Sequence, residues 1–134
     1  MKRVLDQIDI NACEEIIENC VFYCKKTVRQ RYYRGDGSYG YAIDKYEFLI
    51  IAENSIKKGI ILKCGEEDLH WFVYRKWRNM SVLSNTLRTG AIHRVWPQNK
   101  MISCCYEYND NYEEKLAMTK HLADIAGLSL RDEK

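Results

Sequence analysis

The chain contains 134 residues, of which 46% are hydrophobic and 30% are charged, and its formal net charge is +2 at pH 7. This balance is that of one compact domain, and it excludes a disordered chain. The longest purely apolar run, residues 48–52, is far shorter than the roughly 20 residues that span a bilayer. Because Asp6 and Asp9 interrupt the N-terminal segment that an export signal would use, we expect a cytoplasmic protein.

The six cysteines indicate free thiols rather than a disulfide framework or a metal site. Cys13, Cys20 and Cys24 recur at the spacing of one helical face, where a thiol behaves as a small hydrophobe. A zinc site would need a C-x-x-C pair, which the sequence lacks, and the adjacent Cys104 and Cys105 would point to opposite faces of a strand. We therefore expect neither a metal nor a cofactor.

Residues 11–30 are predicted to form the first helix. Asn11 and Glu14 have the spacing of a capping box, and the acids of this segment precede its bases, as the helix dipole favours. The next segment, residues 31–41, alternates tyrosines with arginines and contains three glycines. Because glycines interrupt regular structure, we expect an exposed loop that leads into a strand.

Two antiparallel strands are predicted next, at residues 46–53 and 59–64. Residues 69–87 then place apolar side chains at helical spacing after three acids, and Gly90 ends the pattern, so we predict a helix. A strand over residues 69–77 is the alternative, because Trp, Phe, Val and Tyr favour strands.

The C-terminal third predicts two more strands and a last helix. Residues 91–96 and 101–108 have strand-like composition, and the segment 97–100 between them has the residues of a hairpin turn. The helix should cover residues 111–126, with Gly127 as its C-cap.

Residues 131–134 should fray. The predicted element order is therefore α-β-β-α-β-β-α. The simplest architecture that buries these faces is a single compact α+β domain over residues 1–134, with its helices packed on an antiparallel four-stranded sheet.

The stretch of residues 69–106 contains no acid, six Lys or Arg residues and all three tryptophans. On a helix, Trp71, Tyr74, Arg75 and Arg78 would project together as an aromatic and basic patch. Arginines pair with phosphates and aromatic rings accept unpaired bases, so this composition suits nucleic acid. The same residue types dominate protein hot spots, and burial of the rings in the core is a further alternative. The complete candidate site comprises Arg31, Arg34, Trp71, Tyr74, Arg75, Arg78, Arg94 and Trp96.

These features predict a small non-enzymatic binding protein whose basic, aromatic surface engages nucleic acid or a nucleic-acid-handling protein. The abundance of Ile, Lys, Asn and Tyr is typical of an AT-rich coding genome, such as that of a low-GC bacterium or its phage. A phage-type inhibitor that binds a bacterial nucleic-acid-processing defence effector is therefore an alternative function.

A second alternative is a metal-dependent nuclease. Residues 35–38, with the sequence Gly-Asp-Gly-Ser after a predicted helix, resemble the helix end of the LAGLIDADG homing endonucleases. The resemblance implies that Asp36 holds a divalent metal ion. Arg31 and Arg34 stand where that family has a helix-packing glycine and an acid.

Overall fold

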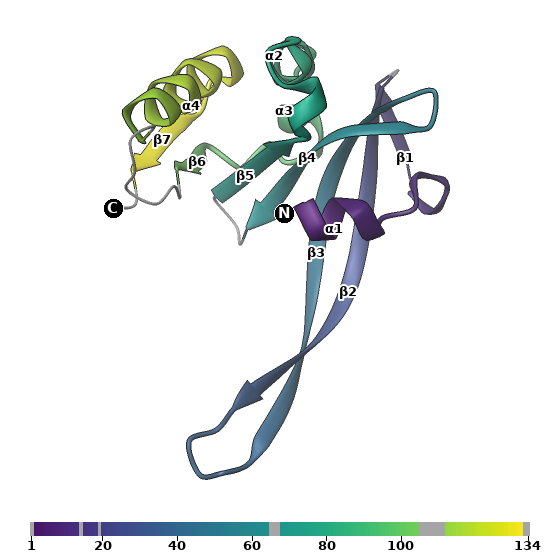
Figure 1. Ribbon diagram of the computed structural model, residues 1–134, viewed down its shortest axis with the longest axis vertical. Coiled ribbons are helices and arrows are strands. Elements are labelled where there is room, and N and C mark those ends of the chain that lie inside the picture. The colour runs from purple at the N-terminus through teal and green to yellow at the C-terminus, as the bar shows by residue number, and fades with distance from the viewer. Residues whose placement is uncertain (1, 14, 19, 65–67, 105–111, 133–134) are drawn as a thin grey trace.

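A seven-stranded sheet forms the centre of the protein, as the computed structural model in Figure 1 shows. The structure describes residues 2–13, 15–18, 20–64, 68–104 and 112–132. The strands, which lie in the sheet in their order along the chain, are β1 (Glu15–Glu18), β2 (Val21–Tyr33), β3 (Tyr39–Glu53), β4 (Ile56–Cys64), β5 (Asp68–Val73), β6 (Met101–Cys104) and β7 (Ser129–Asp132). The described helices are α1 (Lys2–Gln7), α2 (Val82–Arg88), α3 (Ala91–Val95) and α4 (Tyr112–Ala126), together with the 3-10 helices η1 (Ile10–Ala12) and η2 (Arg75–Trp77).

The sheet is mixed, so the expected antiparallel four-stranded sheet and the α-β-β-α-β-β-α order are wrong. Strands β1 to β5 form an antiparallel meander, whereas β6 pairs in parallel with both β5 and β7. Parallel neighbours need a crossover connection. Helices α2 and α3 lie in the connection from β5 to β6, and α4 lies in the connection from β6 to β7.

Helices cover both faces of the sheet. On one face, Leu5 and Ile8 at the N-terminus pack with Phe48 and Ile50 of β3. On the other face, Leu49 packs with buried residues of α2, α3 and α4. Because successive side chains of a strand point to opposite faces, the apolar run in β3 contributes to two cores, and this explains why it does not alternate with polar residues.

The helix predicted for residues 11–30 is wrong, because β1 and β2 occupy this segment. Tyr23 enters one core and Cys24 enters the other, so a period of two fits the same apolar residues that fit a helical period. Strand β2 forms instead of a helix because it makes thirteen residue pairs with β3, and the sequence of residues 21–33 alone does not reveal this pairing. The capping residue also differs: the Asp9 carboxylate accepts a hydrogen bond of 3.0 Å from the backbone N–H of Asn11 and caps η1.

The helix predicted for residues 69–87 is correct only for its C-terminal part, α2. The alternative, a strand at the start of this segment, is confirmed as β5, which pairs with β4 over six residues and buries Leu69 completely. Gly90 follows α2 with a positive φ of 75° and separates it from α3.

The strand predicted for residues 91–96 is also wrong, because this segment forms α3 and buries Ala91 and Ile92 against the sheet. There is consequently no hairpin at residues 97–100. Residues 101–104 are confirmed as a strand, β6, and the rest of that prediction falls on residues 105–111, which lie outside the described part of the chain.

Several predicted elements are confirmed. The strands at residues 46–53 and 59–64 lie within β3 and β4 and pair antiparallel. The last helix is α4, and Gly127 follows it with a φ of 72°. Residues 131 and 132, which were expected to fray, instead pair with β6 as the end of β7.

Candidate nucleic-acid interface

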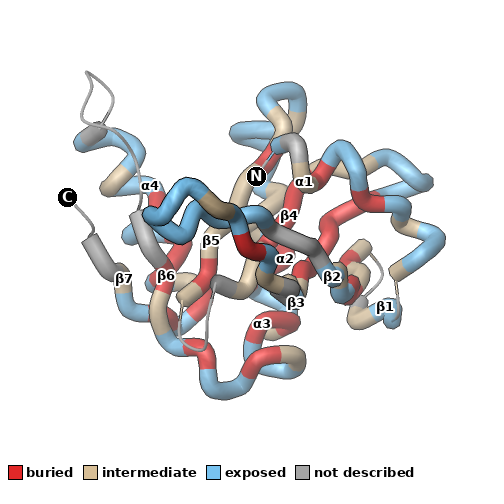
Figure 2. The backbone as a smooth tube through the Cα atoms, turned by 90° about the horizontal axis from the view of Figure 1, so that it is seen from below, coloured by how far each residue is buried: buried red, intermediate tan, exposed pale blue. Residues whose placement is uncertain are grey.

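A two-stranded ribbon projects from the body of the protein (Figure 1). Strands β2 and β3 pair as far as Tyr33 and Tyr39, whereas the pairing of β3 with β4 begins only at Glu47. Residues 27–45, which we call the arm, therefore extend beyond the rest of the sheet. At about 3.3 Å per residue, the seven residue pairs of the arm reach about 23 Å. Residues 31–37 at the end of the arm are all exposed, and Figure 2 looks at the protein from the side of this end.

The tip of the arm is a closed turn. The N–H of Arg34 donates to the carbonyl of Ser38 over 3.1 Å, and Gly35 and Gly37 adopt positive φ angles of 89° and 88°. The Asp36 carboxylate accepts hydrogen bonds from the hydroxyl and from the backbone N–H of Ser38, which hold the pKa of Asp36 below its usual value. The segment that resembles the helix end of the LAGLIDADG endonucleases is thus the tip of a β-hairpin.

One face of the arm carries a stacked set of aromatic and basic side chains. The register places Tyr33 opposite Tyr39 and Arg31 opposite Tyr41, so all four share this face. The rings of Tyr33 and Tyr39 have centroids 5.4 Å apart, and the Arg31 guanidinium lies 3.7 Å from the centre of the Tyr39 ring. The three tyrosines are 48–59% exposed and share one face, and exposed apolar surface that is gathered in this way marks interaction sites.

The opposite face of the arm carries a second aromatic and basic pair. Tyr32 lies opposite Gly40, and a Cβ atom on this glycine would lie only 2.6 Å from the Tyr32 ring. The missing side chain therefore lets the ring lie across the partner strand. The Arg34 guanidinium is 6.0 Å from the centre of the Tyr32 ring, and both side chains are exposed.

The arm is also positively charged. Residues 27–45 contain four basic and two acidic residues. The side chains of Arg31, Arg34 and Lys45 are exposed, and none of them forms an ion pair with a described carboxylate. The arm therefore presents unpaired cations and exposed rings together, which is the chemistry that phosphates and bases require.

Glu47 fixes the root of the arm to the body. Its carboxylate accepts hydrogen bonds from the Tyr23 hydroxyl, from the Trp96 indole N–H over 3.3 Å and from the Lys63 ammonium over 3.2 Å. Partial burial opposes ionisation of Glu47, but these donors outweigh it and hold the pKa below its usual value. Trp96, a predicted site residue, is only 3% exposed and acts here as an anchor.

The patch predicted around residue 71 does not form on one helix, because Trp71 belongs to β5. Its ring is half-buried against the core beneath α2 and α4. Tyr74 is also half-buried and donates a hydrogen bond to Asp6. Burial, together with this hydrogen bond, raises the pKa of Tyr74 to about 12. Tyr74 therefore holds the N-terminal segment against the sheet.

The remaining predicted arginines occupy separate places on the body. Arg75 is exposed on η2. Arg78 donates from Nε to the carbonyl of Val73 over 2.9 Å. Arg94 donates to the carbonyls of Ile17 and Thr89, so it connects α3 with β1. Of the eight predicted site residues, only Arg31 and Arg34 lie on the arm.

The tyrosines of the arm do not belong to the candidate site that the sequence predicts. The signal that identifies them is the presence of two tyrosines on each side of a Gly-Asp-Gly-Ser turn, with arginines beside those that precede it. This pattern becomes informative once residues 21–33 are recognised as a strand rather than the end of a helix.

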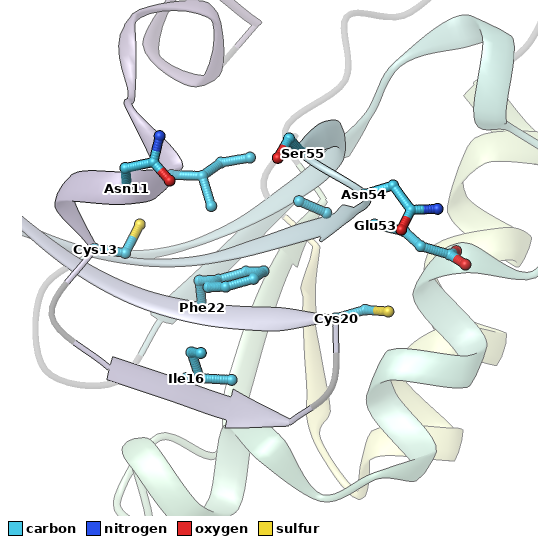
Figure 3. Close-up of a pocket in the computed structure, with 10 residues that line it drawn as sticks. Asn11, Cys13, Ile16, Cys20, Phe22, Glu53, Asn54 and Ser55 are labelled. Atoms are coloured by element: carbon cyan, nitrogen blue, oxygen red, sulfur yellow. The ribbon is translucent and has the colours of Figure 1, made fainter.

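A hollow of about 480 Å³ lies between η1, β1, β2 and the β3–β4 turn (Figure 3). The Phe22 ring lies between Cys13 and Cys20 in this hollow. Burial and the neighbouring Cys24 thiol raise the pKa of Cys13 to about 12, so Cys13 is a protonated thiol at neutral pH. All three cysteines are free, although they lie on strands and loops rather than on a helix. The predicted free thiols at the other three cysteines concern side chains outside the described part.

The fold and the site define an α+β protein that is built on a mixed sheet and carries a basic, aromatic arm. No protein-family model, curated protein or solved structure significantly matches this chain. Among the described residues, no three His, Cys, Asp or Glu side chains form a group that could hold a metal ion. None of the described helices is long and apolar enough to cross a membrane.

Proposed function

We propose that the protein binds nucleic acid, and that the arm is its main contact element. The observation that carries the proposal is the exposed stack of Arg31 and Tyr39, flanked by Tyr33 and Tyr41, on a ribbon that lies outside the sheet. The major groove of B-DNA is about 12 Å wide and admits a two-stranded ribbon. Ribbon-type readers of duplex DNA use strands in this way.

In this proposal the two kinds of side chain have different tasks. Arg31, Arg34 and Lys45 neutralise phosphates, which supplies affinity for any sequence. The exposed rings of Tyr33 and Tyr39 pack against sugars and base edges. No reaction step is assigned to the arm, so the proposed activity is binding rather than catalysis.

The test measures the affinity for a fluorescent DNA duplex by anisotropy over a series of salt concentrations. Replacing Arg31 and Arg34 with alanine should weaken binding at least tenfold at low salt and lower the log-log salt slope by about 0.9 for each lost phosphate contact. Arg75→Ala is the matched control, because Arg75 is an exposed arginine on the body. Unchanged affinity and slope in the double variant, or an equal loss in the control, would remove the arm from the proposal.

A protein partner is the second candidate function, and the four exposed tyrosines of the arm are the observation that favours it. Tyr and Arg dominate hot spots in protein interfaces. The partner would be a nucleic-acid-processing effector, and this protein would be its phage-type inhibitor. In that case Tyr39→Ala should weaken binding to the effector more than Arg31→Ala, and the affinity for duplex should be negligible at physiological salt.

A further inference from the structure

A groove of about 720 Å³ lies on the body between β5, η2, α2 and α4, away from the arm. Two half-buried tryptophans, Trp71 and Trp77, contribute to its wall. Its described cations are Arg78 and Arg88, together with Lys115 of α4. None of the described residues that line the groove is acidic. The groove thus joins aromatic surface to positive charge within a concave site of ligand size.

The groove has a built arrangement of rings and cations. Arg78 is held in place by its bond to the Val73 carbonyl, and its guanidinium lies 5.4 Å from the centre of the Phe72 ring. Arg88 ends α2 with an exposed side chain that makes no ion pair with a described carboxylate. The Arg88 guanidinium is therefore available for an anion such as phosphate, whereas the Arg78 guanidinium lies against Phe72, a ring that packs with the opposite core.

The two tryptophans differ in what already contacts them. The ammonium groups of Lys58 and Lys76 lie 4.5 and 5.1 Å from the centre of the Trp77 ring. Trp77 therefore already makes cation–π contacts, which add to the positive field beside the groove. Trp71 has no cation over its ring among the described contacts, so we assign it to an aromatic part of the ligand.

We propose that this groove binds a nucleoside 5′-phosphate, with the base against Trp71 and the phosphate at Arg88. An apolar ligand would leave the cations without a counter-charge, and a simple anion would leave the indole wall uncovered. A nucleotide satisfies both, and stacking on an aromatic ring contributes about 1–3 kcal/mol per base. The ligand is either a free nucleotide or the 5′-phosphorylated end of a strand, which share this chemistry. The inference does not rest on the arm.

The experiment follows the three indole N–H signals of the ¹⁵N-labelled protein during titration with adenosine 5′-monophosphate. The signals of Trp71 and Trp77 should shift, whereas that of Trp96 should not, because its N–H is bonded to Glu47 in the buried root of the arm. Adenosine and inorganic phosphate, titrated separately, should each bind at least tenfold more weakly. Absence of shifts at millimolar nucleotide, or equal binding of inorganic phosphate, would overturn the proposal.

Variants then locate the phosphate. Arg88→Ala should weaken nucleotide binding at least fivefold, while Arg75→Ala, an arginine that does not line the groove, should leave it unchanged. Equal effects of the two changes would contradict the assignment. A short single strand with a 5′-phosphate and the same strand ending in a hydroxyl are then tested as competitors of adenosine 5′-monophosphate. Competition by the phosphorylated strand identifies strand ends as the ligand. If neither strand competes, the ligand is the free nucleotide.

The Arg31→Ala, Arg34→Ala double variant separates this inference from the proposed function. If that variant loses duplex binding and retains the nucleotide-induced shifts, both proposals stand. If wild-type protein does not bind duplex but shows the shifts, only the groove proposal stands. If it binds duplex and shows no shifts, the groove proposal fails alone.

Discussion

At the scale of single residues, Glu47 connects the stability of the body to the position of the arm. Its carboxylate accepts hydrogen bonds from three donors that belong to β2, β4 and the segment after α3. Hydrogen bonds to a charged group are worth about 1.5–3 kcal/mol, more than those between neutral partners. These three donors therefore stabilise the ionised form of Glu47.

We predict that Glu47→Gln lowers the free energy of unfolding by about 1–2 kcal/mol at pH 7. The folded-state pKa of Glu47 lies below its unfolded value of about 4.3. The stabilisation by its charge is thus fully present above that unfolded value and disappears as the pH falls through the folded-state pKa. Urea unfolding from pH 7 to pH 3 should show the difference between wild type and variant shrinking below about pH 4.3. A difference that stays constant with pH would contradict the role of the charge.

The matched control is Glu53→Gln. Glu53 also accepts from a lysine, Lys58, over 2.9 Å, but its side chain is 55% exposed. An exposed pair contributes only about 0–1 kcal/mol, so this variant should change little at any pH.

At the scale of elements, the arm depends on a close approach between its strands at Gly40. A methyl group at this position would meet the Tyr32 ring at 2.6 Å and the Nε atom of Arg34 at 2.8 Å. Both side chains would have to move, while the backbone pairing of the arm has no reason to change.

Gly40→Ala should therefore weaken duplex binding severalfold without lowering the melting temperature of the body by more than about 2 °C, since the arm lies outside both cores. Anisotropy titration and calorimetry measure the two effects. In a Tyr32→Ala background the same change should have a smaller effect on binding, because the clash with the ring is gone and only the contact with Arg34 remains. Additive losses in the double variant would show that Gly40 acts through something other than Tyr32.

The elements also show how far the sequence could predict the fold. The β3–β4 hairpin and α4 were predictable, because turn residues and capping signals bound a single clear period. Residues 21–33 were not, because their apolar positions fit both periods. Their ladder with β3 also joins residues as distant in sequence as Val21 and Ile51, which no local window contains. α3 was missed because short segments rich in Ile, Val and Trp favour strands unless tertiary contacts decide otherwise.

The same limit applies to the candidate site. The arginines at positions 31 and 34 were recognisable from their alternation with tyrosine. The patch around Trp71 was inferred from helical spacing, and this inference failed when β5 placed the ring against the core. Trp96 could not be recognised as buried, because its partner Glu47 is 49 residues away.

At the scale of the whole molecule, the arm and the body are separable units. The described side chains of the arm join neither of the two core clusters, whereas Tyr46 and Phe48 at its root already pack with the body. The native turn follows the pair Tyr33 and Tyr39. Thr27 and Lys45 form another pair, six positions nearer the body, and their side chains point to the same face of the ribbon. Since an even number separates the two pairs, the turn can be moved without exchanging the faces of the ribbon.

The last prediction uses this geometry. Deleting residues 28–33 and 39–44 joins Thr27 to the native turn, residues 34–38, and the turn to Lys45. The body should fold with a melting temperature within a few degrees of the wild type, because both cores stay intact. Duplex affinity should fall at least tenfold, because Arg31 and all four tyrosines of the arm are gone. Nucleotide binding in the groove between α2 and α4 should not change, since no arm residue lines it.

The three results are measured separately: the melting temperature by calorimetry, the duplex affinity by anisotropy and nucleotide binding by the shifts of the indole N–H signals. Retained duplex affinity would move the nucleic-acid site from the arm to the body.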